Sequence, residues 1–340
     1  MSDFKNKIVL TGIKPTGRLH LGNYVGAMVP TLELGGKALD DGGTLVMFIA
    51  DYHAINAMKD PVALKEAIKN LACAYLASGL DANRAIFYRQ SDVPEITELT
   101  TILMAYTPKG FMNKAHAYKA QVDKNVAKGE PADAGINMGL YTYPVLMAAD
   151  ILGYGTDVVP VGKDQVQHVE MAQDIAGFIN YHFQKEVLKV PEYYLKPNAA
   201  VLPGLDGRKM SKSYDNVIPL FGTPDEVKKA VMGIKTDSQA IDAPKNPDEI
   251  LLFQILQGVG RPATVQEVKE GLEKGGMGYG TIKKMLLAEL EEVLPSREKY
   301  LDYQNHFSDV EDLLRQGAEK ARKLARPVLE RVKDAVFGRG

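Results

Sequence analysis

Short apolar runs alternate with helix-like stretches along the first two-thirds of the chain. The β-prone runs are Ile8–Leu10, Thr44–Asp51, Ala85–Ser91 and Thr156–Gly162. Apolar runs of this length are typical of strands buried in a parallel sheet. Helical patterns lie between them, and the one over residues 60–79 ends on Gly79 as a C-cap. This alternation predicts an α/β fold built on a doubly wound parallel sheet.

The pattern changes after about Phe221, where helical patterns follow one another and no strand pattern returns. Thr223 is a predicted N-cap, Pro224 takes the first helical position, and Glu226 completes a capping box. We therefore expect two domains, an α/β domain over residues 1–220 and an all-α domain over residues 221–340.

The last predicted helix, Leu314–Gly340, is strongly basic. It carries eight Lys or Arg residues against three Asp or Glu residues, beside a stripe of apolar side chains. One interpretation is a surface helix with a solvated basic face, and the other is a helix whose basic face contacts RNA. Its apolar stripe also allows it to pack back on the first domain.

Composition narrows the class of protein. Lys and Arg number 41 and Asp and Glu number 43, so the net charge is −2 and any contact with nucleic acid must be local. The single cysteine, Cys73, excludes an intrachain disulfide and a thiolate metal cluster. The first residues lack the apolar segment of a signal peptide, and no apolar run is long enough to cross a bilayer. These features lead us to expect a cytoplasmic protein without a membrane partner.

The loop after the first predicted strand, residues 11–27, is rich in glycine and suits a phosphate ligand. It matches neither the dinucleotide-binding fingerprint nor the P-loop. His20 and Asn23 can donate hydrogen bonds, and a helix that begins near Leu21 directs its positive end at the loop. A histidine at a helix start is, however, commonly a cap or a packing residue.

A second polar segment, Lys209–Ser213, reads Lys-Met-Ser-Lys-Ser. By itself it is compatible with a solvated loop or with a mobile clamp on a phosphate chain. The nearby Gly204 and Gly207 give such a clamp conformational freedom.

Together the two segments resemble the signatures of class I aminoacyl-tRNA synthetases. His20–Asn23 is similar to their H-I-G-H motif, and Lys209–Ser213 matches their K-M-S-K-S motif in every letter. Three further stretches, Ile49–Ile55, Tyr141–Leu152 and Pro160–His168, are similar to motifs of bacterial-type tryptophanyl-tRNA synthetases. The resemblance covers nearly the whole chain and implies a Rossmann-like catalytic domain followed by a helical domain that binds the tRNA anticodon.

The stretch Tyr141–Leu152 also fits this resemblance on physical grounds. Tyr143, Met147 and Asp150 are spaced to share one helix face, and we expect Pro144 in the first turn of that helix. Asp150 has apolar neighbours, so its carboxylate needs a donor, which the indole N–H of tryptophan can supply. The alternative is a structural carboxylate bonded to backbone or arginine.

The resemblance assigns roles to individual positions. It implies catalytic roles for His20, Asn23, Lys119, Lys209 and Lys212, with Lys114 close to the loosely aligned Lys119. It implies ATP contacts at Lys14, Pro15, Thr16, Gly22, Asn23, Gly162, Lys163, Asp164, Val201, Lys209, Met210, Ser211, Lys212 and Ser213. It implies tryptophan contacts at Leu10, His53, Tyr143, Met147, Asp150, Ile151, Val161 and Gln165. Lys14 and Lys163 depart from the family, which commonly has Gln and Glu there.

The implied reaction joins L-tryptophan to tRNA-Trp in two steps. The amino-acid carboxylate attacks the α-phosphorus of ATP, and the 2′-OH of the terminal tRNA adenosine then accepts the aminoacyl group. Mg²⁺ accompanies ATP, no protein-only metal site is expected, and the family implies a homodimer.

Three other interpretations remain open from the sequence. The first is a tyrosyl-specific synthetase of the same fold, because a tyrosine hydroxyl could also donate to Asp150. The second is a nucleotidyltransferase that does not act on tRNA, and the third is a non-catalytic paralogue. The helical second domain and the complete Lys209–Ser213 motif argue against the nucleotidyltransferase. The intact His20, Asn23, Lys209, Lys212 and Asp150 argue against the non-catalytic paralogue.

Overall fold

The computed structural model describes residues 3–195 and 202–339. Its centre is a five-stranded parallel sheet of β1 (Ile8–Ile13), β2 (Thr44–Ile49), β3 (Ile86–Arg89), β4 (Val158–Val161) and β5 (Glu192–Leu195). The strand order is β3-β2-β1-β4-β5, with all pairs parallel. From β1 the chain adds β2 and β3 on one side of the sheet and then β4 and β5 on the other side. Ligands of doubly wound sheets bind at such a switch point, here between β1 and β4.

Alternate residues of the central strands feed two hydrophobic cores on the two faces of the sheet. Val46 and Phe48 of β2 point to the first core, whereas Leu45 and Met47 point to the second. The first core packs on α5 (Pro94–Tyr106), α8 (Met138–Leu152), α9 (Val166–Phe183) and α15 (Phe307–Phe337). The second packs on α2 (Val29–Asp40), α4 (Pro61–Ala77) and α14 (Arg297–Asn305). Both faces are therefore covered, as the continuous apolar strands predicted.

The sequence located four of these five strands. Helix α4 also ends as expected, because Gly79 follows its C-cap with a positive φ of 100°. The sequence missed β5, an edge strand of four residues (Glu-Tyr-Tyr-Leu) that are mostly exposed and too few to stand out as a buried apolar run.

One helix begins earlier than expected. We placed Pro144 in the first turn of its helix, but α8 starts at Met138, where the side chain of Asn137 accepts from the backbone N–H of Leu140. Pro144 consequently lies inside α8. The capping residue seven positions upstream, rather than the proline, sets this boundary.

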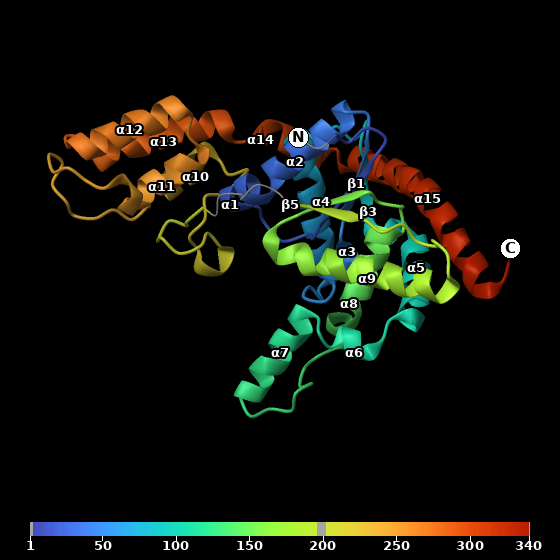
Figure 1. Ribbon diagram of the computed structural model, residues 1–340. Coiled ribbons are helices and arrows are strands. Elements are labelled where there is room, and N and C mark those ends of the chain that lie inside the picture. The colour runs from blue at the N-terminus through green and yellow to red at the C-terminus, as the bar shows by residue number, and fades with distance from the viewer. Residues whose placement is uncertain (1–2, 196–201, 340) are drawn as a thin grey trace.

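A separate helical body lies beyond the sheet. It contains α10 (Pro224–Met232), α11 (Leu251–Val259), α12 (Pro262–Lys274) and α13 (Tyr279–Val293), which share a third core (Figure 1). The predicted capping box at Thr223 is present at the start of α10. Leu21, Leu202 and Met210 belong to this third core as well, so both signature segments are anchored in the helical body.

The last helix, α15, returns to the sheet and covers its β3 edge. A Cβ atom on Gly317 would come within 1.8 Å of the Phe87 carbonyl oxygen, so only glycine allows this approach of helix to strand. Arg322 and Arg326 both donate to the buried carboxylate of Glu95 on α5. The basic side chains of α15 thus serve contacts within the chain, which favours the packing interpretation over an RNA-binding face.

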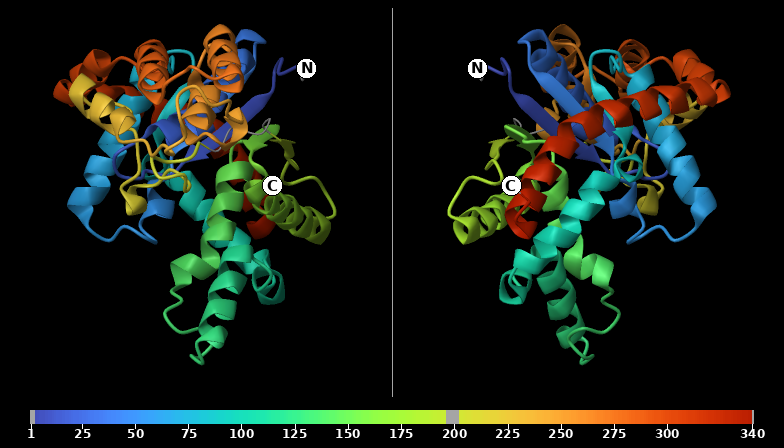
Figure 2. Two further views of the ribbon diagram at one scale, coloured as in Figure 1. Left: turned by 90° about the vertical axis from the view of Figure 1, so that its left-hand side faces the viewer. Right: turned by 90° about the vertical axis from the view of Figure 1, so that its right-hand side faces the viewer.

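Short helices complete the chain: α1 (Leu21–Asn23), a π-helical turn (Tyr24–Met28), α3 (Asp51–Ala54), α6 (Lys109–Met112) and α7 (His116–Ala127). Single 3₁₀ turns lie at Gln90–Asp92, Lys163–Gln165, Lys212–Tyr214 and Pro247–Glu249. Helix α7 and the residues that follow it form an arm that projects from the rest of the molecule (Figure 2). Among the described residues, no helix is both long and apolar enough to span a membrane.

Candidate active site

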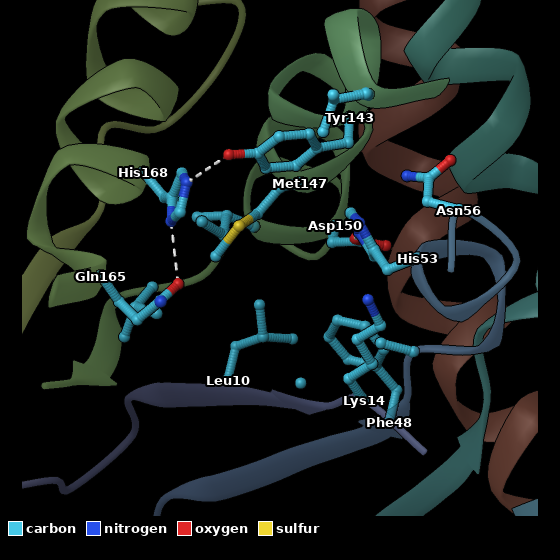
Figure 3. Close-up of a pocket in the computed structure, with 15 residues that line it drawn as sticks. Leu10, Lys14, Phe48, His53, Asn56, Tyr143, Met147, Asp150, Gln165 and His168 are labelled. Atoms are coloured by element: carbon cyan, nitrogen blue, oxygen red, sulfur yellow. Dashed lines mark hydrogen bonds and ion pairs between the residues drawn. The ribbon is translucent and has the colours of Figure 1, made fainter. Parts of the chain in front are cut away.

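A cavity of about 300 Å³ opens at the carboxyl ends of the central strands. Leu10 and Gly12 of β1 and Val159 of β4 line it, which places it at the switch point of the sheet. Helix α8 supplies the opposite wall (Figure 3). The complete lining is Leu10, Gly12, Lys14, Phe48, Ala50, His53, Asn56, Leu140, Tyr143, Met147, Asp150, Ile151, Val159, Gln165 and His168.

Asp150 is the buried carboxylate of this cavity. The residue is 2% exposed, and burial raises its pKa although hydrogen bonds from His53 and Gln90 act in the opposite direction. Nε2 of His53 lies 2.8 Å from Oδ2, and Nε2 of Gln90 lies 2.8 Å from both carboxylate oxygens. The group is therefore a satisfied acceptor that faces an apolar cavity, where a ligand donor can reach it.

A second polar chain lies on the other side of the cavity. The Tyr143 hydroxyl is 2.8 Å from Nε2 of His168, and Nδ1 of His168 is 2.8 Å from Oε1 of Gln165 (Figure 3). These three residues come from α8, α9 and the 3₁₀ turn before α9. Polar groups at two ends of an apolar cavity suit a ligand that is aromatic at one end and polar at the other.

His20 is the N-cap of α1, which is the alternative that we considered from the sequence. Its Nδ1 accepts from the backbone N–H of Asn23 at 3.3 Å, and Oδ1 of Asn23 accepts from the His20 backbone at 3.2 Å. Burial and the nearby Lys212 lower the pKa of His20 to about 4. The imidazole is consequently neutral at pH 7 and carries its proton on Nε2, so capping leaves it a donor.

Hydrogen bonds from Asn216, which is 2% exposed, hold the Lys209–Ser213 segment in place. Its Oδ1 accepts from the Ser211 backbone at 2.8 Å, and its Nδ2 donates to the Lys209 carbonyl and to Oδ1 of Asp206. Asp206 also accepts from Arg208, whose guanidinium lies over the ring of Tyr214. Asp206 and Arg208 thus help to hold this loop in its conformation.

The loop brings Lys212 next to the first glycine-rich loop. A Cβ atom on Gly17 would lie 3.3 Å from Nζ of Lys212. Although most of the lysine side chain is exposed, partial burial of its ammonium end lowers its pKa. The two signature segments therefore meet in space and place a lysine ammonium near a neutral histidine.

The structure brings most of the expected amino-acid contacts into one cavity. The cavity is lined by Leu10, His53, Tyr143, Met147, Asp150, Ile151 and Gln165. Val161 does not line it. Val161 lies in the first core, and Val159, two residues earlier on the same strand, takes the lining position. Strand alternation makes both residues face the same way, so the sequence could not separate them.

The expected ATP contacts are distributed around the mouth of the cavity and the two loops. Lys14 lines the cavity itself, on the side of His53 (Figure 3). Pro15 is buried, Thr16 and Ser213 are exposed, and Met210 packs in the third core beside Leu21. Gly22 lies close to the His20 ring and to Met210, whereas Gly162 and Lys163 follow β4. The side chain of Asp164 and all of Val201 lie outside the described residues.

Two of the expected catalytic lysines, Lys209 and Lys119, have no described side-chain hydrogen bond or ion pair to another described residue. Lys209 is exposed next to its loop, and Lys119 is exposed on α7 in the projecting arm. Lys119 does not line the cavity. Its role stays a prediction.

Sequence reasoning missed several residues that shape the site. Gln90 and Asn216 are buried amides that bond Asp150 and the Lys209–Ser213 loop. Phe48 and His168 line the cavity. The signal for Gln90 was its position directly after β3, because residues that follow parallel strands meet at one edge of the sheet.

Comparison with known proteins identifies the family. The sequence profile of class I tRNA synthetases (W and Y) matches residues 4–295. The chain belongs to this family.

Individual synthetases of the family resemble the chain over nearly all of its length. The tryptophan–tRNA ligase of Pseudomonas syringae pv. tomato is 47% identical, over 96% of this chain and 73% of that protein. The tryptophan–tRNA ligase of Neisseria meningitidis is 46% identical, over 97% of each chain. A crystal structure of tryptophanyl-tRNA synthetase from Campylobacter jejuni, complexed with ADP and tryptophan, is 40% identical with a TM-score of 0.85, covering 97% of this chain and 99% of that chain.

A tyrosine-specific synthetase shares the fold at a greater distance. The tyrosyl-tRNA synthetase of Archaeoglobus fulgidus, solved with L-tyrosine, is 20% identical over 87% of this chain and 90% of that chain, with a TM-score of 0.59. The fold is thus common to synthetases of both specificities, and side chains of the cavity must distinguish them.

Proposed function

We propose that this chain is a tryptophan–tRNA ligase that activates L-tryptophan with ATP and then transfers it to tRNA-Trp. The observation that carries the proposal is the buried Asp150 acceptor in an apolar cavity at the switch point of a class I synthetase fold. The two similar tryptophan–tRNA ligases and the tryptophan-bound relative support the same substrate.

Tryptophan would enter with its indole toward Asp150. Leu10, Phe48 and Met147 offer apolar and thioether contacts to the ring system. The indole N–H would donate to Asp150, and the polar chain of Tyr143, His168 and Gln165 would receive the ammonium and carboxylate end. A cavity that pairs the N–H in this way rejects phenylalanine, which lacks a donor, by roughly 10⁴-fold.

The first chemical step requires positioning and charge neutralisation rather than a general base. The tryptophan carboxylate is already ionised at pH 7 and attacks the α-phosphorus of ATP, whereupon pyrophosphate leaves. The neutral His20 would donate from Nε2 to the phosphates, and Lys209 and Lys212 would offset the charge that grows on the leaving group. In the second step the 2′-OH of the terminal tRNA adenosine attacks the activated carbonyl.

Mg²⁺ would arrive with ATP and neutralise part of the triphosphate charge. Among the described residues, no three His, Cys, Asp or Glu side chains cluster as metal ligands. The phosphates would therefore hold this ion, and the lysines would contact the phosphates beside it.

The remaining partners follow from the same proposal. The helical body of α10–α13 would bind the anticodon, within the all-α domain expected over residues 221–340, and a homodimer in the cytoplasm would bring both ends of one tRNA within reach. Sedimentation of the purified protein tests the dimer, and a single monomer species across micromolar concentrations would count against it.

ATP–pyrophosphate exchange with each of the 20 amino acids tests the substrate. We expect tryptophan to give the highest kcat/KM, and charging of tRNA-Trp to follow. Tyrosine as the best substrate would replace the proposal with the tyrosyl-specific alternative. Exchange without any tRNA charging would favour a nucleotidyltransferase.

A further inference from the structure

Gln90 is a buried residue that contacts the carboxylate of Asp150 but does not itself line the cavity. It begins the 3₁₀ turn after β3, and the residue is 1% exposed. Its Nε2 lies 2.8 Å from each oxygen of Asp150, and its Oε1 accepts from the Tyr52 backbone at 3.1 Å. The described side-chain hydrogen bonds of Gln90 therefore join α3, the turn after β3 and α8.

The direction of this hydrogen-bond chain is fixed by its first member. A backbone N–H can only donate, so the Tyr52 N–H, which Asp51 also accepts, favours the oxygen of the Gln90 amide on its side. The NH₂ group must then face Asp150. Because a carboxamide cannot turn over without losing both contacts, Asp150 always receives hydrogen bonds from this side and acts as an acceptor.

The backbone on both sides of this chain is also held in place. Asp51 accepts from the backbone of Tyr52, from the backbone of Ser91 and from the Ser91 hydroxyl. Asp51 is itself 6% exposed. The segments that carry Tyr52 and Gln90 are thereby bonded to one carboxylate, which fixes the distance between them.

The two carboxylate oxygens of Asp150 differ in their described partners. His53 approaches Oδ2, whereas Oδ1 has only Gln90 as a described partner. A carboxylate has about four lone-pair positions, so Oδ1 retains capacity for a further donor. Since Nε2 of Gln90 is equally distant from both oxygens, it also sets the rotation of the carboxylate plane.

We propose that Gln90 is a positioning residue for amino-acid specificity, which orients Asp150 so that Oδ1 accepts the indole N–H of tryptophan. The inference rests on the proposed function and assigns a determinant outside the cavity wall. Orientation of a buried acceptor matters because hydrogen-bond strength falls steeply as the donor angle departs from linearity.

The test compares two amino acids in ATP–pyrophosphate exchange, in the wild type and in Gln90→Met. One is L-tryptophan, and the other is L-3-benzothienylalanine, in which sulfur replaces the indole N–H in a ring of similar shape. Methionine keeps the unbranched length of glutamine but cannot donate to Asp150. The matched control is Gln173→Met, which removes a 2.8 Å hydrogen bond from Gln173 to the Pro191 carbonyl, away from the cavity.

We expect the wild type to prefer tryptophan by roughly 100-fold or more in kcat/KM. Gln90→Met should reduce this preference by roughly tenfold, through a higher KM for tryptophan, while the KM for ATP stays unchanged. Gln173→Met should keep the wild-type ratio. A purely structural role for Gln90 would lower kcat/KM for both amino acids equally, and that result would overturn the inference.

A second variant covers the case in which Gln90→Met does not fold. Gln90→Glu is nearly isosteric, but two adjacent carboxyl groups retain a shared proton, so Asp150 is no longer a pure acceptor. It should lower the tryptophan preference as well, and an unchanged ratio in this variant would also overturn the inference. If the wild type does not activate tryptophan at all, the proposed function fails, independently of the Gln90 result.

Discussion

The thioether sulfur of Met210 lies 3.3 Å from the backbone nitrogen of Gly22 and joins the two signature segments of the chain. Close by, the Leu21 N–H donates to the Ile218 carbonyl at 2.9 Å, which ties the start of α1 to the chain just after Asn216. The histidine of one segment and the lysines of the other are therefore held by a common framework. Their relative placement depends on these few contacts.

Loss of the Lys212 ammonium should slow adenylate formation far more than it weakens tryptophan binding. Lys212 lies beside the Gly17 loop and does not line the cavity. We expect Lys212→Ala to lower the exchange rate by roughly 100-fold, since stabilisation of a charged transition state contributes several kcal/mol. Tryptophan affinity from equilibrium dialysis should change less than threefold, by the same argument. Lys284→Ala, an exposed lysine of α13, serves as control.

Equal loss of exchange and of tryptophan binding in Lys212→Ala would contradict this prediction. It would mean that the loop supports the cavity rather than the phosphates.

Removal of the Asn216 side chain should disorder the Lys209–Ser213 loop. The Ala variant leaves the Ser211 N–H and Asp206 without their buried amide partner, at a cost of about 1–3 kcal/mol of unfolding free energy. Its KM for ATP should rise, because the lysines lose their fixed position. Denaturant titration and exchange kinetics measure the two effects.

Asn180→Ala provides a matched control for that experiment. Asn180 of α9 also makes three side-chain hydrogen bonds, all to the backbone of Val187 and Leu188. These two residues follow α9 and belong to neither signature segment. It should lose similar stability with an unchanged KM for ATP. A raised KM for ATP in both variants would show that general loosening is responsible.

His20 should make the folded state sensitive to mild acid. Its pKa falls from an ordinary value of 6.5 to about 4 in the fold, so the unfolded chain binds a proton more readily between these values. The stability that depends on a neutral His20 is present above pH 6.5 and is lost as pH falls toward 4. Asn caps helices well and does not titrate, so His20→Asn should reduce the drop in Tm between pH 7 and pH 5. An identical drop in both proteins would contradict the assignment.

The Asp150 carboxylate should lower the stability of the fold while it provides specificity for tryptophan. Burial raises its pKa, so the ionised form is disfavoured in the fold, and a neutral isostere removes that cost at pH values above the raised pKa. We expect Asp150→Asn to keep or raise Tm at pH 7 while it lowers kcat/KM for tryptophan by roughly 100-fold or more. Calorimetry and exchange kinetics test the two parts, and a clearly lower Tm would show that the carboxylate stabilises the fold.

The sequence predicted the sheet better than the arrangement of the helices. Strands such as Thr44–Ile49 are recognisable because burial on both faces requires continuous apolar residues. Strand β5 lies at an edge and has only four residues, so periodicity does not reveal it. The return of α15 to the sheet depends on contacts such as Glu95 with Arg322, which lie more than 200 residues apart and leave no local pattern.

The site was predictable where a motif or a helix face fixes the geometry. Tyr143, Met147 and Asp150 share the cavity because α8 repeats every 3.6 residues. The partners of Asp150 were not predictable in this way. His53 and Gln90 approach it from two other elements, and their bonds follow from the packing of those elements rather than from spacing along the chain.

The close packing of Gly317 on Phe87 has a consequence for the β3 edge while the protein is being synthesised. Strand β3 (Ile86–Arg89) leaves the ribosome well before helix α15 (Phe307–Phe337), which shields its outer backbone. Until then the nascent sheet presents an open strand that could pair with another chain. Chaperone binding during translation would protect this edge, and a bulkier residue at position 317 would prolong the vulnerable period after release.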